Sequence, residues 1–193
     1  MKTLILSLCL FGVSFLTSCL IPETSHSVPD YFLLTSREVD SNQSSNSNAV
    51  SFYVKEVRLP HYLLDKRLVS RPTDDTIVFR ENQRWGEPLE IGVGRVLSQN
   101  LGLLLDTFSY GFYPQRRKFE YKHEVEIFIE RFEFVSENSV KLKASWGINK
   151  KGGSIGRGAF EQTYSLQNND VKSQVRALSN LLFDLSNEIA RMF

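Results

Sequence analysis

The chain has 193 residues, of which 41% are hydrophobic and 12% aromatic, and its formal net charge is +1. This length and aromatic content suit one folded domain with a full core and exclude a disordered chain. The near-neutral charge excludes the broad basic field of a nucleic-acid-binding protein, so we expect no nucleic-acid partner.

The first eighteen residues have the pattern of a bacterial lipoprotein signal peptide. A lysine at position 2 precedes an apolar run, Leu4 to Leu16, that is too short for a membrane-spanning helix. The run ends in Leu16-Thr17-Ser18-Cys19, where a large aliphatic residue and two small residues precede a cysteine. The pattern predicts removal of residues 1–18 and lipidation of the Cys19 thiol. An ordinary cleaved signal with a chance cysteine is the alternative.

Residues 19–29 read as a tether, because two prolines and small polar residues cannot build a core. Leu20 follows the lipidated cysteine. In enteric-type bacteria an Asp there retains a lipoprotein in the inner membrane, so Leu20 predicts the outer membrane. Of the two cysteines, Cys9 leaves with the leader and Cys19 carries lipid, so the mature chain has no disulfide and depends on packing.

From residue 30 onward, short apolar runs and alternations predict strands separated by turn residues. In the first part of the domain we expect strands at 31–35, 50–59, 67–71 and 76–80, a polar loop at 40–48 and a short turn at 61–64. Pro60 ends the second of these strands, because proline cannot donate to a strand ladder.

Two longer helices are predicted. One runs from about 88 to 104, with Pro88 at its first position and apolar residues at helical spacing, although Asn100 falls on the apolar side. The other covers about 170–192, is capped by Asn169 or Asp170, and carries one long apolar stripe. The stripe fits either a coiled coil or a helix laid on a sheet, and the second is favoured.

Three strands are expected between the helices. The alternation over 125–134 changes parity at Glu130-Arg131, which indicates a β-bulge. Residues 140–148 alternate cleanly, with Trp146 on the buried face, and a hairpin turn at 150–153 leads to a strand at 159–166. We predict a single α/β domain of the α+β kind over 30–193, with a mixed or mainly antiparallel sheet and both helices on one face.

The sequence contains no recognisable catalytic or metal-binding pattern. His26, His61 and His123 lie far apart without a second ligand at metal spacing, and the Gly-x-Ser-x-Gly motif is absent. The glycine-rich stretch 152–158 resembles a phosphate loop, but it lacks the Gly-Lys-Ser/Thr ending and joins two strands. We interpret it as a hairpin, and we expect no enzyme, no cofactor and no metal.

Four short blocks in the middle of the chain resemble a known family. They are Val57 to Leu63, Leu68 to Arg71, Arg84 to Leu89, and Val96 to Leu101. Their order is similar to that of the PqiC/YmbA-type ABC-type transport auxiliary lipoproteins, and Trp-x-Glu-Pro-Leu before a helix is the most specific block. The likeness is sharp over 57–101 and extends, in element order, to 30–193. The 40–48 loop and Gly86, where Ala is commoner, depart from it.

The resemblance implies a non-enzymatic accessory lipoprotein of an MCE (mammalian-cell-entry) ABC-type lipid transport system between the two membranes. Its expected partner is the periplasmic MCE-domain protein, and a homo-oligomer would suit a ring-shaped conduit. An envelope-assembly lipoprotein, such as a lipopolysaccharide-export plug or a secretin pilot, is the alternative, and a periplasmic hydrolase is a weaker one. Two basic segments, Arg116 to Lys118 and Lys150 to Arg157, are candidates for contact with an acidic partner or lipid headgroups.

Overall fold

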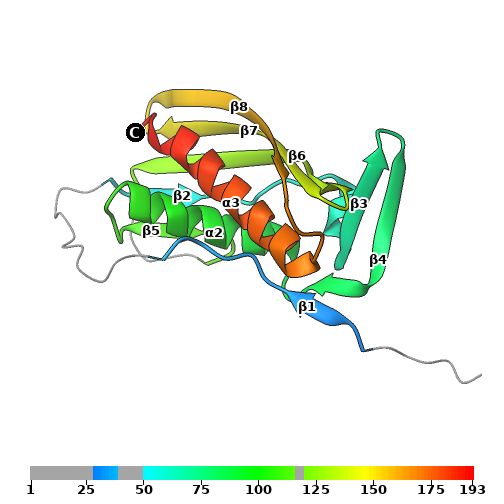
Figure 1. Ribbon diagram of the computed structural model, residues 1–193. Helices are drawn as coiled ribbons and strands as arrows, with labels where there is room; N and C mark the ends of the chain where they lie inside the picture. The colour runs from blue at the N-terminus through cyan, green and yellow to red at the C-terminus, as the bar shows by residue number, and fades with distance from the viewer. Residues whose placement is uncertain (1–27, 39–49, 116–119) are drawn as a thin grey trace, which may run out of the picture.

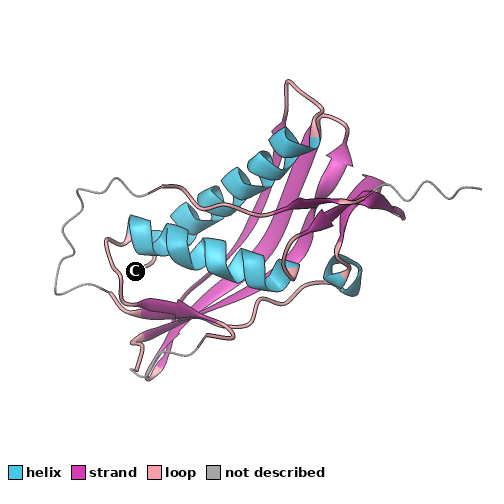
Figure 2. Cartoon of the chain, turned by 90° about the horizontal axis from the view of Figure 1, so that it is seen from below, coloured by secondary structure: helices cyan, strands magenta, loops and turns pink. Residues whose placement is uncertain are grey.

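The computed structural model of the chain describes residues 28–38, 50–115 and 120–193. These residues form one mixed sheet of eight strands, with helices α2 (Leu89–Leu104) and α3 (Val171–Ala190) lying on one face (Figures 1 and 2). The predicted fold class is therefore confirmed. The 40–48 loop and the 116–118 loop lie outside the described residues.

The strands, in chain order, are β1 (Asp30–Phe32), β2 (Phe52–Val54), β3 (Arg67–Thr73), β4 (Thr76–Trp85), β5 (Tyr110–Phe112), β6 (His123–Ser136), β7 (Ser139–Lys150) and β8 (Gly153–Ser165). The 3₁₀ helix η1 (His61–Leu64) stands where the short turn was expected. Strands β6, β7 and β8 form a long antiparallel meander.

The second edge of β6 is shared by two strands. Strand β2 pairs with the start of β6 in parallel, with Phe52 opposite His123, and β3 joins its far end in parallel, with Ser70 opposite Phe134. Beyond them the sheet branches, because β5 adds to β2 in parallel while β4 adds to β3 antiparallel and β1 adds to β4 in parallel. Both parallel and antiparallel pairs are thus present, as the prediction of a mixed sheet requires.

The helices and the bulge were predicted accurately. Both helices end within two residues of the expected bounds, and Asp170 is the cap of α3, accepting a hydrogen bond from the Ser173 backbone N–H at 2.9 Å. The register of β6 shifts between Ile129 and Arg131, at the predicted bulge. Helix α3 packs on β7 and beside α2, which agrees with a helix laid on a sheet.

The strand expected over 50–59 was wrong in its length, because the regular ladder ends at Val54. The backbone N–H groups of Lys55 and Arg58 donate to the carbonyls of Val125 and Ile127. Between these two bonds the chain after β2 advances three residues, from 55 to 58, while β6 advances two, from 125 to 127. The extra residue breaks the ladder. Strand β5 was not predicted, since three residues give too short a pattern.

The first strand and β4 also differ from their predicted bounds. Strand β1 ends at Phe32 rather than at residue 35, because the chain there leaves the sheet and turns toward the helices. Strand β4 extends from Thr76 to Trp85 instead of stopping at residue 80, since its last residues pair with β1.

Strand β8 begins at Gly153, six residues earlier than predicted. Gly152 and Gly153 have φ values of +109° and +137°, which allow a tight turn directly after β7. Further along, a Cβ on Gly158 would lie 2.7 Å from Cζ2 of Trp146, so the missing side chain leaves room for that ring. The glycine-rich stretch therefore serves a hairpin and close packing, as the hairpin interpretation expected.

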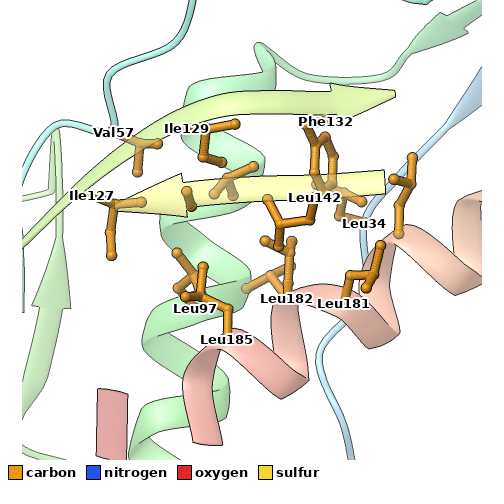
Figure 3. Close-up of a cluster of buried hydrophobic side chains, with 14 of the residues drawn as sticks. Leu34, Val57, Leu97, Ile127, Ile129, Phe132, Leu142, Leu181, Leu182 and Leu185 are labelled. Carbon is orange, nitrogen blue, oxygen red and sulfur yellow. The ribbon is translucent and has the colours of Figure 1, made fainter. Parts of the chain in front are cut away.

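The hydrophobic core lies between the sheet and the two helices. Figure 3 shows Leu97 of α2 and Leu182 and Leu185 of α3 pointing toward Ile127 and Ile129 of β6. All five side chains are at most 1% exposed. Trp146, only 8% exposed, is on the buried face of β7 as predicted.

A short extended segment, residues 33–37, crosses the groove between α2 and α3, and we call it the strap (Figure 1). Leu34, which is 2% exposed, is its buried anchor. The backbone N–H of Thr35 donates to Ser179 Oγ at 3.2 Å, and that of Arg37 donates to Asn100 Oδ1 at 3.0 Å. The polar residue on the apolar side of α2 is thus explained by its bond to the strap.

Replacing Leu34 by Ala should lower the free energy of unfolding by about 2–5 kcal/mol, because it leaves a cavity between the two helices. Leu33→Ala is the matched control, since Leu33 is 55% exposed and its loss should cost within about 0.5 kcal/mol. Urea unfolding followed by circular dichroism measures both. Equal costs for the two variants would show that the strap is not part of the cooperative core.

Candidate interaction surfaces

Of the residues singled out in the sequence, those that the structure describes do not converge on a catalytic centre. Cys19 and His26 lie outside the described residues. His61 begins η1, whereas His123 begins β6, where its Nδ1 lies 3.1 Å from the Ser51 carbonyl and its ring meets the edge of Phe193. Within the described ranges, no group of three His, Cys, Asp or Glu side chains is placed to hold a metal ion.

A buried carboxylate is the most chemically distinctive group in the described part of the chain. Glu133 of β6 is 1% exposed and accepts hydrogen bonds from Tyr62 Oη at 2.7 Å and from Arg131 Nε at 2.6 Å. Burial, together with the hydrogen bond to Glu133, raises the pKa of Tyr62 above its ordinary value. The phenol therefore keeps its proton, and both carboxylate oxygens have donors. This cluster ties η1 to the sheet.

The motif blocks in the middle of the chain are structural. Trp85, at the end of β4, is 6% exposed and stacks on Phe132 with ring centroids 6.4 Å apart. Glu87 accepts a hydrogen bond at 2.6 Å from Arg95, whose guanidinium also donates to the Leu34 carbonyl at 2.9 Å. The Trp-x-Glu-Pro-Leu block therefore joins the sheet, α2 and the strap.

The open face of the sheet, opposite the helices, carries charges that pair across strands. Lys141 meets Glu161 at 2.6 Å, Lys143 meets Glu130 at 2.6 Å, and Lys55 meets Glu126 at 2.9 Å. Such exposed pairs are screened by water and contribute little to stability. Their effect is to keep this face hydrated and locally neutral.

The end of the domain where β1 meets α3 has a different character. A shallow groove of about 240 Å³ is lined there by apolar, polar and cationic side chains, namely Phe32, Leu33, Thr35, Lys172, Val175, Arg176 and Ser179. Tyr31 and Leu33 expose 61% and 55% of their surface beside it. This groove combines an apolar floor with a cationic rim.

Of the two basic segments named from the sequence, the structure describes only the second. Arg116 to Lys118 lies outside the described residues. The second segment forms the predicted β7–β8 hairpin, in which Lys150 ends β7 and Arg157 lies within β8. Sequence reasoning missed the Glu133 cluster and the β1–α3 groove. Alternation places Glu133 on the wet face, and only the tertiary position of Tyr62 buries it.

Solved structures share the fold of this chain. A crystal structure of an uncharacterised protein is 21% identical, with a TM-score of 0.70, covering 86% of this chain and 98% of its own. A protein from Xanthomonas campestris of family DUF330 is 11% identical, with a TM-score of 0.65, covering 83% and 92%. The PelC L103M dodecamer from Paraburkholderia phytofirmans is 7% identical, covering 74% and 87%, with a TM-score of 0.47 that is too low to establish a shared fold.

No curated protein matches the chain. Among the described helices, none combines the length and apolar character needed to cross a bilayer. The model of the ABC-type transport auxiliary lipoprotein component matches residues 32–190, which include every motif block quoted from the sequence. The PqiC/YmbA-type resemblance is thereby confirmed, and the chain belongs to the family of ABC-type transport auxiliary lipoproteins.

Proposed function

We propose that this protein is a lipid-anchored, non-enzymatic component at the periplasmic face of the outer membrane. There it docks the MCE-domain protein of an ABC-type intermembrane lipid transporter. The family match over 32–190 carries the proposal, because the family is an auxiliary component of transport systems and not an enzyme. The Leu16-Thr17-Ser18-Cys19 pattern supports a lipid anchor, and Leu20 supports the outer membrane as its location.

The packing of the domain supports docking rather than lipid carriage. The groove between α2 and α3, where a two-helix layer could open around an acyl chain, is filled by Leu34 of the strap. The buried carboxylate Glu133 is satisfied by Tyr62 and Arg131. What the domain offers a partner is therefore its surface, with the charge-paired open face on one side and the β1–α3 end on another.

Lipidation at Cys19 is tested by Cys19→Ala, which should leave a precursor that keeps residues 1–18 and takes up no labelled palmitate. The thiol is the acceptor of the diacylglycerol, so its loss blocks both steps. Cys9→Ala is the control and should leave labelling unchanged, because Cys9 belongs to the leader. Labelling that survives Cys19→Ala would disprove the anchor assignment.

The partner is tested by photo-cross-linking in cells, with a probe amino acid placed at Phe128 on the open face or at Val78 on the β3–β4 hairpin. Both positions are exposed, at 41% and 47%. We expect at least one of them to capture the MCE-domain protein, while a probe at the buried Leu97 captures nothing. Capture of an outer-membrane barrel without any MCE protein would replace the transport assignment by the envelope-assembly alternative.

Self-association is part of this proposal, because a ring-shaped conduit presents the same binding site several times. Light scattering on residues 19–193 should therefore report a species larger than about 20 kDa, the size of one domain of this length. Dilution should shift the distribution toward that mass. A single 20-kDa species at all concentrations would contradict the homo-oligomer.

A further inference from the structure

We infer that the β1–α3 end of the domain lies directly on the bilayer, an inference that rests on the anchoring proposed at Cys19. Tyr31 and Leu33 would enter the headgroup region, and Lys172 and Arg176 would meet the phosphates of anionic phospholipids. We call these four residues the tether face.

The length of the tether keeps this end close to the membrane. Eight residues lie between Cys19 and Val28, the first described residue, so the nine steps along the chain span at most about 30 Å. A domain of this size is about 40 Å across. The acyl anchor therefore cannot reach past the domain, and β1, which begins at Asp30, stays on the membrane side.

The exposed apolar side chains of the tether face lie where a bilayer would cover them. Tyr31 lies on β1, an edge strand that pairs with β4 alone among the described strands, and Leu33 follows it at the start of the strap. Val28, at 86% exposure, continues the apolar surface toward the tether. Tyrosine suits this position because its ring is apolar and its hydroxyl remains in water.

The cations of the tether face differ from those elsewhere on the domain. Lys172 and Arg176 lie one turn apart on α3 and line the same groove as Leu33. Lys141 and Lys143 on the open face each bind a carboxylate at 2.6 Å, whereas neither tether-face cation forms an ion pair with a described residue. Asp170, at the start of the helix, caps α3 through the Ser173 N–H and attracts Arg176 electrostatically without forming an ion pair with it.

Cationic residues near β1 and β4 would also suit contact with an anionic membrane. Tyr31 stands opposite Arg84 of β4 in register, and Lys66 lies near Arg84 in an adjoining pocket. The acids of that pocket, Asp65 and Glu81, both bind Arg67. Lys66 is therefore exposed to solvent near β1, whereas Arg84 is half-buried, with its Nε atom buried.

Fluorescence quenching on the acylated protein in vesicles tests the placement. The leader is removed and Cys19 is blocked by lipid, so an introduced cysteine is the only free thiol of the chain. A polarity-sensitive dye on a Leu33→Cys variant should be quenched by lipids that carry bromine near the headgroup. The same dye on Val78→Cys or Phe128→Cys, the matched exposed apolar positions, should keep its emission.

The charge contribution is tested in the same vesicles, made of phosphatidylcholine with phosphatidylglycerol. Each Lys or Arg near an anionic surface contributes about fivefold to association, so Lys172→Gln/Arg176→Gln should lower the docked-to-undocked ratio by roughly 25-fold. Lys141→Gln/Lys143→Gln is the matched control and should change it little. Vesicles of phosphatidylcholine alone should reproduce the effect of the first double variant.

The position of the quenching, and its response to the charge changes, distinguish contact with the bilayer from the alternatives. Quenching at position 33 that responds to the Lys172 and Arg176 changes supports the inference. Quenching at 78 or 128 instead, or at none of the three, overturns it and places the tether face toward a protein or a second copy. If Cys19 carries no lipid, the protein does not stay with the vesicles at all, which overturns both the anchor and this placement with a different readout.

Discussion

Packing of the two helices on the β6–β7 ladder is the interaction on which the rest of the structure depends. The described residues contain no cysteine, so no disulfide joins them and their stability comes from the apolar layer between these elements. Strand β6 is long enough to be paired by β7 on one edge and shared by β2 and β3 on the other. The strap completes the layer, because Leu34 fills the groove that two adjacent helices leave open.

The same packing divides the surface into regions that differ in charge pairing and polarity. Where the sheet has no helices over it, charges alternate across strands and neutralise each other, as Lys143 and Glu130 do. At the end where the tether enters, cations and apolar side chains stand together in a groove without such pairing. The proposed role as a lipid-anchored docking protein would use this division, because one part of the surface would face the bilayer and another would remain free for a partner.

The family motif has a structural basis that bears on function. Tyr62 and Trp85 come from different blocks, yet both pack against the end of β6 at Glu133 and Phe132. They hold η1 and β4 in place around that strand. The blocks thus preserve a scaffold rather than a reaction centre, which agrees with membership of a family of transport auxiliary components.

The sequence by itself determined the elements whose pattern is local. The two helices, the bulge at Glu130 and the alternating strand through Trp146 were predicted because their periodicity repeats over many residues. The three-residue strands β1, β2 and β5 were misjudged, since such short pairings are defined by their neighbours. Burial of Glu133 and the β1–α3 groove were decided only by the tertiary structure, because both arise where segments distant in the chain meet, and no local pattern records that meeting.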